Sequence, residues 1–410
     1  FMCSANSDAD RPADREGPGE GPHPAHSDAG SGSTSSPQPP SAAGAYTPRS
    51  AARSTVRRSG WRYTFSSLAV PSFRLLWLAM LFRGACLGME HIARGFLVYE
   101  ITGSAKILGL VSAASVVPVL FLALFSGAIA DRLDRKHLIQ MAQAISTASS
   151  LFVAISITSG TLTWLHLLFA GMVSSGASSF MVPARQAMIP QLVAKERLGN
   201  AIALVSMGMS VTSLVAPAMG GVLYAAFGPE IVFYLIAALG TCALALAGLI
   251  PRIAKQSRRN TESMLSEIKQ GLELVWHDRI VLWLLGLSLV TGLLTAPFGQ
   301  LLPVFVVDVY HRESQAFGLM MSVMEGGVVA GSLAIAILGE GRRGLLMIVG
   351  SILGSVAMLA IALIPSYFVA AGIMLIFGLG LGARDVLFQV LVLERVDDQY
   401  RGRIISIMVF

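Results

Sequence analysis

The stretch that decides the fold is FRLLWLAMLFRGACLGMEHIARGFLV, residues 73–98, a long apolar run with few ionisable side chains. A helix needs roughly 20 such residues to cross the hydrocarbon core of a bilayer. Runs of similar length recur at 107–130, 137–158, 162–182, 200–225, 231–250, 280–306, 315–338, 344–364 and 367–392. The sequence therefore predicts an all-α membrane protein with ten complete spans, and a further run begins at Ile404.

The composition agrees with a membrane protein. Hydrophobic residues make up 54% of the 410 residues and charged residues only 13%, whereas a soluble domain carries about 25% charged residues. A soluble enzyme is therefore excluded. The three cysteines, Cys3, Cys86 and Cys242, are too few and too scattered for a disulfide framework or a metal site.

The basic residues indicate which way the chain crosses the membrane. Of the thirty lysines and arginines, twenty-three lie next to the first run or in every second break between runs, and the alternate breaks hold only Lys106 and Arg312. Basic loops stay on the cytoplasmic side. We therefore expect a multi-pass protein of the plasma membrane with a cytoplasmic N-terminus. The net charge of +6 then needs no nucleic-acid partner.

The runs divide the chain into four segments. Residues 1–60 are rich in proline, glycine and serine, which predicts a disordered cytoplasmic tail. Residues 61–250 form an N-terminal six-helix bundle, and 251–279 form a cytoplasmic linker with an amphipathic helix. Residues 280–410 echo the first half at an offset of about 205 residues, as in parallel-repeat transporters. We expect this second bundle to be truncated, with four helices and the start of a fifth, and the last two helices missing.

The break at residues 127–136 reads GAIADRLDRK. It resembles the loop signature of the major facilitator superfamily, Gly-x-x-x-Asp-Arg-x-Gly-Arg-Arg/Lys, and departs from it at Asp134, where the family usually has glycine. The matching positions are Gly127, Asp131, Arg132, Arg135 and Lys136. The resemblance implies the major facilitator fold, with two six-helix bundles in a parallel pseudo-repeat.

A second motif lies in the fifth run. Thr212 to Gly221 is similar to the antiporter signature Gly-x-x-x-Gly-Pro-x-x-Gly-Gly, and Pro217, Gly220 and Gly221 match it. Physically, such a helix can kink and pack closely. The stretches 73–77, 97–104, 183–190 and 401–403 look like the branch with enterobactin-exporter-like and macrolide-efflux-like proteins. That resemblance implies alternating access and proton-driven export of small amphipathic compounds.

Ionisable side chains inside the runs indicate a functional site, because each costs several kcal/mol in lipid. The first run carries Arg83, Glu90, His91 and Arg94. At about 100° per residue, all but His91 fall within roughly 40° of one another, and His91 lies at the edge of that face. The face must line a wet cavity or pair with another helix. The remaining candidates for proton coupling or the cavity are Glu325, Arg384 and Asp385.

Each of these residues has a functional and a structural interpretation. Glu90 is the first candidate proton carrier and His91 the second, and the alternative is a fixed ion pair between Glu90 and Arg94. Glu325 suits a structural role better than a protonatable one. We expect Arg384 and Asp385 to form a gate or an inter-helix pair. In the superfamily, spans one, four, seven and ten line the central cavity, and most of these charges lie on that set.

The sequence thus predicts a secondary transporter, a monomer whose partners are a small-molecule substrate, protons and the lipid bilayer. A siderophore or a macrolide-like drug fits the resemblance. No nucleophile motif, phosphate loop or metal-ligand spacing is present in the sequence, so we expect no enzyme activity, no cofactor and no metal. Import of a metabolite, or a non-transporting membrane receptor or scaffold, remains as an alternative.

Overall fold

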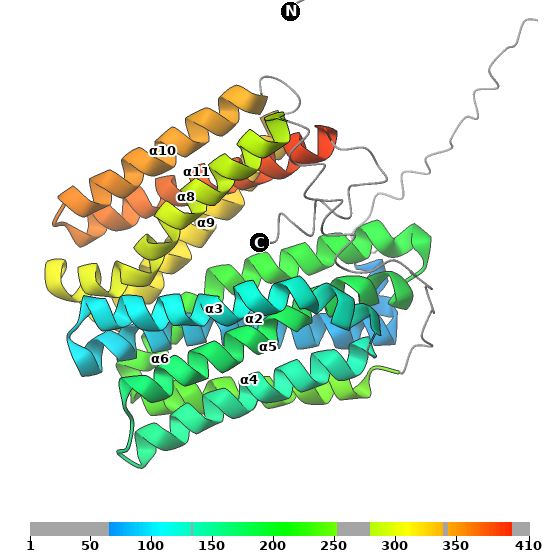
Figure 1. Cartoon of the computed structure of the whole chain (residues 1–410), viewed down its shortest axis with the longest axis horizontal. Coiled ribbons are helices and arrows are strands. Elements are labelled where there is room, and N and C mark those ends of the chain that lie inside the picture. The colour runs from blue at the N-terminus through cyan, green and yellow to red at the C-terminus, as the bar shows by residue number, and fades with distance from the viewer. Residues whose placement is uncertain (1–64, 133, 252–278, 339–342, 396–410) are drawn as a thin grey trace, which may run out of the picture. The chain divides into compact units, whose positions relative to one another are not determined.

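The computed structural model describes residues 65–132, 134–251, 279–338 and 343–395. Every regular element in these ranges is a helix, which confirms the predicted all-α class (Figure 1). The elements are η1 (Ser66–Ala69), α2 (Pro71–Thr102), α3 (Ala105–Arg132), α4 (Arg135–Thr158), α5 (Trp164–Leu192), η2 (Lys195–Arg197), α6 (Leu198–Leu249), α8 (Arg279–Val304), η3 (Phe305–Val309), α9 (Ser314–Leu338), α10 (Arg343–Leu363) and α11 (Tyr367–Arg395).

Among the described residues, nine helical segments are long and apolar enough to cross a membrane. One of them contains α6, which has 52 residues and at 1.5 Å per residue is about 78 Å long, far more than a hydrocarbon core of about 30 Å. Gly228 breaks it with φ 83° and ψ 168°, and Pro229 follows. The two parts of α6 therefore correspond to two separate crossings, as the runs at 200–225 and 231–250 predict.

Local sequence signals set the helix ends. Pro71 begins α2, a position where its missing N–H costs nothing. Gly103 ends the same helix in the left-handed region, with φ 60°. Asp134 caps α4 by accepting a hydrogen bond from the Lys136 backbone N–H at 2.9 Å. Thr163 caps α5.

The predicted end of the fourth run at residue 182 was wrong. Helix α5 continues to Leu192 through Pro183 and Pro190, and Arg185 lies within the helix instead of in a cytoplasmic break. Proline is tolerated in membrane helices where neighbouring groups satisfy the freed backbone positions. The physical reason for the error is that a proline and a charge together imitate a helix end.

Small residues bring α2 and α6 together. A Cβ atom on Gly220 would lie 3.0 Å from the Met89 Cα, and one on Gly88 would lie 2.7 Å from the Ala216 Cβ. Close backbone approach of this kind is the usual basis of helix packing in lipid, where no hydrophobic force drives association. Outward-facing side chains, in contrast, are large and apolar, as with Phe169 and Phe368, which are 60% and 76% exposed.

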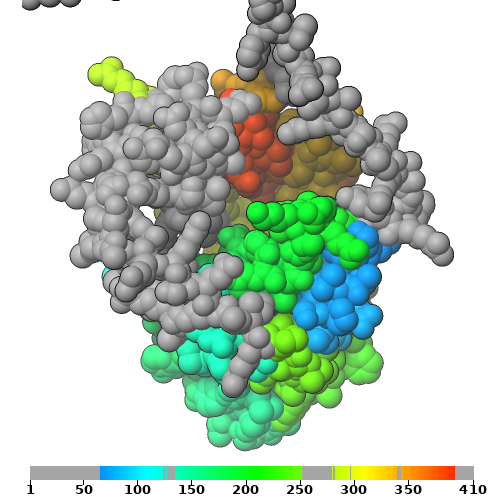
Figure 2. Space-filling model, turned by 90° about the vertical axis from the view of Figure 1, so that its right-hand side faces the viewer, coloured from blue at the N-terminus to red at the C-terminus, as the bar shows by residue number. Residues whose placement is uncertain are grey.

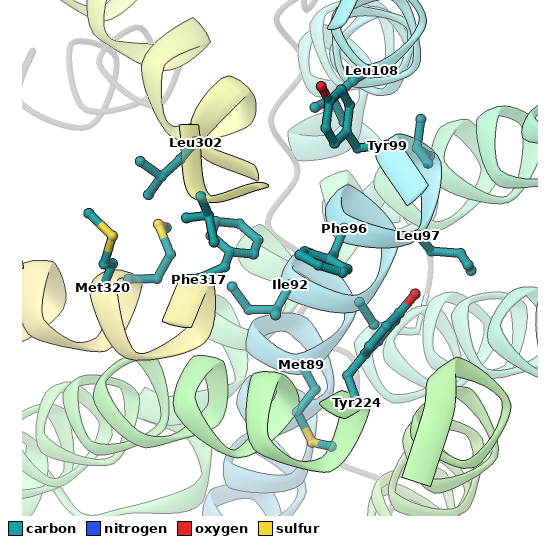
Figure 3. Close-up of a cluster of buried hydrophobic side chains, with 14 of the residues drawn as sticks. Met89, Ile92, Phe96, Leu97, Tyr99, Leu108, Tyr224, Leu302, Phe317 and Met320 are labelled. Carbon is teal, nitrogen blue, oxygen red and sulfur yellow. The ribbon is translucent and has the colours of Figure 1, made fainter. Parts of the chain in front are cut away.

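A buried apolar cluster connects the helices before and after residue 251. Met89, Ile92 and Phe96 of α2 lie in one core with Leu302 of α8 and Phe317 of α9, and Figure 3 shows Ile92 extending toward Phe317. The core therefore does not divide at the predicted linker.

The starts of α2 and α6 lie side by side (Figure 2). The Ser67 backbone N–H donates to Asn200 Oδ1 at 3.1 Å, and the Ser67 hydroxyl donates to the Arg197 carbonyl oxygen at 3.2 Å. The predicted tail at 1–60 and the amphipathic helix of the linker lie outside the described residues, so the domain boundaries stay predictions.

Candidate functional site

Glu90 and Arg94 form an ion pair on α2. Arg94 Nη1 lies 3.2 Å from Glu90 Oε1, and the two side chains are 19% and 7% exposed, respectively. A Cβ atom on Gly171 of α5 would lie 2.8 Å from Arg94 Nη1 and 2.6 Å from Ser115 Oγ. Arg94 thus occupies space that exists only because residue 171 is glycine. The pair is largely desolvated, so a change in the charge of Glu90 acts directly on Arg94.

Next to this pair lies a cavity of about 290 Å³. Its polar lining includes His91 and Arg94 of α2, Ser115 of α3, Ser175 of α5 and Gln300 of α8. The remaining wall is apolar and consists mainly of valine and leucine side chains of α2 and α3. A few polar groups on an apolar wall are typical of small-molecule sites. Three of the four lining helices, α2, α5 and α8, belong to the set that the resemblance implies, and α3 is an addition.

Arg83 lies apart from the Glu90 pair. It is 6% exposed, and its Nη2 donates a hydrogen bond to the Ser178 hydroxyl of α5. It lines a different and smaller cavity, together with Gln143 and Arg185. Arg83 and Glu90 share one helix face, but seven residues separate them by about 10 Å along the axis. The predicted charged face is therefore divided between two cavities.

Glu325 lies on α9 between the two halves of the chain. It is partly buried and lies near Ser213 of α6, whose hydroxyl donates to the Ser210 carbonyl oxygen at 3.2 Å. It does not line the cavity of His91 and Arg94.

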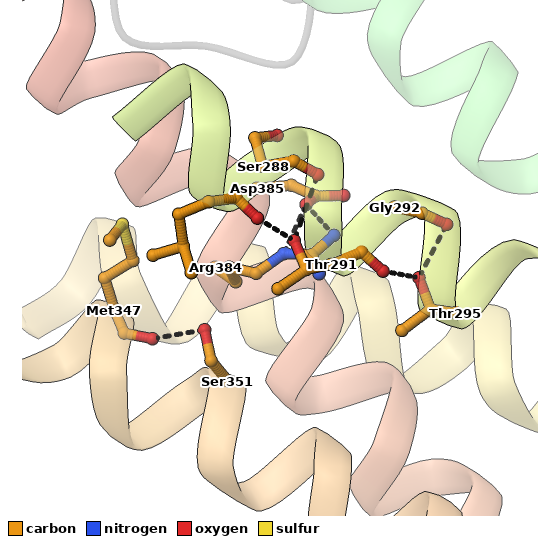
Figure 4. Close-up of polar contacts among 9 residues, drawn as sticks. Ser288, Thr291, Gly292, Thr295, Met347, Ser351, Arg384 and Asp385 are labelled. Atoms are coloured by element: carbon orange, nitrogen blue, oxygen red, sulfur yellow. Dashed lines mark hydrogen bonds and ion pairs between the residues drawn. The ribbon is translucent and has the colours of Figure 1, made fainter. Parts of the chain in front are cut away.

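Arg384 and Asp385 pair with each other on α11 (Figure 4). Arg384 Nε and Nη2 lie 3.1 Å and 2.8 Å from Asp385 Oδ1, and the Asp385 side chain is 51% exposed. Figure 4 places the pair near Ser288 and Thr291 of α8. We expected a gate or a pair between helices; the ion pair forms between neighbours on one helix, and the gate stays a prediction. The long Arg384 side chain reaches the carboxylate of its neighbour in the chain, so the pair needs no second helix.

Residues of the predicted loop motif connect α4 to α5 and α6 through hydrogen bonds. Lys136 Nζ donates to the carbonyl oxygens of Gly248 and Ile250, at 2.7 Å and 2.6 Å, which caps the C-terminal end of α6. Arg135 Nη1 donates to the Ala187 carbonyl oxygen of α5 at 3.0 Å. Gly127, Asp131 and Arg132 lie in the last turns of α3, and their side chains are outside the described part of the structure. Asp134, the departure from the family pattern, is the N-cap of α4.

The antiporter-like motif packs against both halves of the chain. Gly220 faces Met89 of α2, and a Cβ atom on Gly221 would lie 2.5 Å from the Ser314 carbonyl oxygen of α9 and 3.0 Å from the Gly318 Cα. The Ser314 hydroxyl donates to the Gly221 carbonyl oxygen at 3.2 Å. The backbone N–H of Ala218, which follows Pro217, donates to the Ser322 hydroxyl at 2.9 Å. We call this contact between α6 and α9 the seam.

The sequence did not indicate a further link between the halves. The Tyr99 hydroxyl at the end of α2 donates to Asp308 Oδ2 in η3, at the end of α8. The seam lies near the start of α9, which follows η3 in the chain. Both contacts are therefore at the same end of the helices, and that end is closed. The only sequence signal for this link was an acidic residue, Asp308, just after the predicted run at 280–306.

Comparisons with known proteins agree with this geometry. The sequence profile described as transmembrane secretion effector, MFS_3, matches residues 62–409. The multidrug efflux pump Tap of Mycobacterium tuberculosis (strain ATCC 25618 / H37Rv) is 25% identical over 351 residues, which cover 82% of this chain and 82% of Tap. Macrolide efflux protein A of Streptococcus pyogenes is 24% identical over 323 residues, 76% of this chain and 78% of that protein.

Among solved structures, a mutant of the nucleoside transporter NupG superposes with a TM-score of 0.68 at 15% identity, over 82% of this chain and 87% of that one. At this identity the likeness shows the fold alone. It confirms the predicted two-bundle fold of the major facilitator superfamily.

Proposed function

The chain belongs to the transmembrane secretion effector family of the major facilitator superfamily and is a membrane transporter, and from this premise we propose that it exports small amphipathic molecules in exchange for protons. Tap and macrolide efflux protein A, which resemble it over most of their length, are by name efflux pumps. The substrate class that we infer is a drug-like molecule with an apolar body and a hydrogen-bond acceptor.

The cavity beside the Glu90–Arg94 pair is the observation that carries this proposal. Its wall of valine and leucine suits an apolar body, and Arg94, His91 and Gln300 can donate hydrogen bonds to an acceptor at one end. About 290 Å³ is near the lower limit for a small-molecule site, which is roughly 300 Å³. Because Gln300 comes from α8 and the others from α2, substrate contacts both halves.

Exchange follows from competition for Arg94. When Glu90 is ionised, its carboxylate holds Arg94 at 3.2 Å. When Glu90 takes up a proton, the ion pair is lost and Arg94 is left with an unpaired donor in a largely buried place, where an unpaired charge is unfavourable. A substrate acceptor or a second conformation must then satisfy it. Apart from Arg94, the nearest permanently charged group along the same helix is Arg83, so the local field around Glu90 is positive.

The orientation is part of the proposal. The loop motif with Lys136, the linker and the N-terminus lie in the cytoplasm, because basic breaks stay inside. The seam and the Tyr99–Asp308 contact then close the outer end, and substrate enters from the cytoplasm or the inner leaflet. The protein resides in the plasma membrane.

Inside-out membrane vesicles test this function. We expect an imposed proton gradient to drive accumulation of an uncharged fluorescent amphipathic dye with a hydrogen-bond acceptor by the wild-type chain, and an uncoupler to abolish it. Glu90→Gln, which keeps shape but cannot carry a proton, removes the gradient-driven part while protein abundance stays the same. Glu313→Gln, at an exposed position before α9, is the matched control and keeps transport.

Three other results would contradict the proposal. Normal transport by Glu90→Gln eliminates Glu90 as the carrier. Dye movement in the direction of proton flow indicates import. A wild-type chain that is abundant and moves none of a panel of amphipathic compounds indicates a receptor or scaffold.

A further inference from the structure

The second cavity, the one that contains Arg83, has two cations and no acidic side chain in its lining. It lies within the first half of the chain, between α2, α4, α5 and the second part of α6. Arg83 of α2 and Arg185 of α5 both line it, with Gln143 of α4, and the other lining residues are apolar. The cavity takes no part in the transport site described above, because His91, Arg94 and Gln300 line a different one.

Both guanidinium groups have unsatisfied donors. Arg83 is 94% buried, since its exposed fraction is 6%. Its Nη2 is satisfied by the Ser178 hydroxyl, but its Nε is buried without a partner. Arg185 Nε is likewise buried without a partner, and its Nη2 contacts only the Met209 sulfur, at 3.5 Å. A thioether is a weak acceptor. Neither arginine forms an ion pair with any residue that the structure describes.

No carboxylate among the described residues pairs with these two arginines. Arginine stays protonated in proteins, so neither group can become neutral. Glu90, two turns along α2, is already paired with Arg94. The amide donor of Gln143 is engaged with Thr147 and with the Gly240 carbonyl oxygen, and it brings no negative charge. Buried charges in proteins are normally paired, because an unpaired one is strongly unfavourable.

We propose that this cavity binds one small inorganic anion, such as chloride, between Arg83 and Arg185. An anion there would accept hydrogen bonds from the two Nε–H groups and would reduce the net charge of the cavity lining from +2 to +1. The space available is about 20 Å³, and a single water-sized sphere needs about 10–15 Å³. Phosphate, sulfate or the carboxylate of a substrate is too large. The bound anion would fasten α2 to α5, the helices that carry the Glu90–Arg94 pair and Gly171.

Chloride dependence of stability tests this site. The purified chain in lipid nanodiscs is heated in sodium gluconate, and chloride replaces gluconate stepwise at constant ionic strength. We expect a saturable rise of the unfolding temperature with chloride or bromide. Arg185→Gln and Arg83→Gln abolish this rise. Arg384→Gln, which removes a membrane arginine outside the cavity, retains it.

The sign of the effect without chloride gives a second criterion. In gluconate, Arg185→Gln removes an uncompensated charge, so it unfolds no earlier than the wild type. In saturating chloride it unfolds earlier, because it lacks the anion. If Arg185→Gln is less stable than the wild type by the same amount in both salts, the arginine has only a packing role and the proposal is wrong.

Direct binding decides the question where the variants do not fold. The wild-type chain should retain radiolabelled chloride, displaced by bromide and not by sulfate or gluconate. Absence of saturable binding would overturn the proposal. So would binding that survives both Arg83→Gln and Arg185→Gln in folded protein, since it would then be an adventitious ion elsewhere.

Discussion

Gly221→Ala should open the closed end of the transporter. The new methyl group would lie 2.5 Å from the Ser314 carbonyl oxygen, 3.0 Å from the Gly318 Cα and 3.2 Å from the Gly318 nitrogen. All three atoms belong to the backbone of α9, so no side-chain rotation can make room. Ordinary contact begins at 3.4 Å. Helices α6 and α9 must therefore move apart wherever the seam is closed.

The size of the effect follows from overpacking. Extra methyl groups in a well-packed interior cost about 1–3 kcal/mol. Alanine also favours the helix over glycine by about 1 kcal/mol, but that gain is the same whether the seam is closed or open and cancels between the two states. The equilibrium should shift toward the open seam by about 5–150-fold.

Distance measurements between spin labels can detect this shift. Labels at Thr161 and Glu313, which are exposed at the closed end of the two halves, report its separation once the native cysteines are replaced by alanine. We expect a longer-distance population to grow in Gly221→Ala. Gly292→Ala is the matched control, since nothing lies within 4 Å of its methyl group. If folded Gly221→Ala gives the wild-type distance distribution, the seam is not a barrier to opening.

Two further substitutions test the other links. Lys136→Met removes two charged hydrogen bonds to the Gly248 and Ile250 carbonyl oxygens, and we expect it to destabilise the chain by about 1–3 kcal/mol, measured as an earlier thermal unfolding. Tyr99→Phe removes the hydrogen bond to Asp308; because Asp308 is exposed and water replaces the hydroxyl, the closed state should weaken by only about 0.5–1.5 kcal/mol, seen with the same spin labels.

Apolar runs were sufficient to predict the membrane helices, whereas the major facilitator fold was predicted from the resemblance of residues 127–136 to the family signature. A run of about 20 apolar residues has few alternatives to a membrane helix, because backbone polar groups in lipid must pair within the segment. Its ends are harder to predict. The Gly228–Pro229 pair separates two crossings as expected, but Pro183 and Arg185 lie within a continuous helix. The difference is the backbone: Gly228 has a φ of 83°, which ordinary residues rarely adopt.

Periodicity predicted which residues share a face, but not what they contact. It placed Arg83, Glu90 and Arg94 together, and the structure keeps them on one face of α2. A helical wheel gives neither the position of a residue along the helix axis nor the helices packed against it. It therefore could not show that Arg83 contacts Ser178 while Arg94 fills the space beside Gly171. Those contacts depend on α5, more than 70 residues away in the sequence.

Arg185 was missed for a related reason. An arginine next to a proline was assigned to a cytoplasmic break, where it needs no partner. Once α5 is seen to continue to Leu192, the same residue lines a cavity within the bundle, and its Nε–H is buried without a partner. A small error in a helix boundary thus concealed a candidate binding site.

The position of α6 explains how events at Glu90 can reach the seam. Glu90 follows Met89, whose Cα would lie 3.0 Å from a Cβ on Gly220, and the next residue, Gly221, contacts α9 at Ser314. These contacts join backbone to backbone, and closely packed interiors transmit displacement because they compress little. If Glu90 carries the proton as proposed, a small shift of α2 on loss of its ion pair would displace α6 against α9. Gly220 and Gly221, which allow the close packing at this end, would then also couple it to the charge of Glu90.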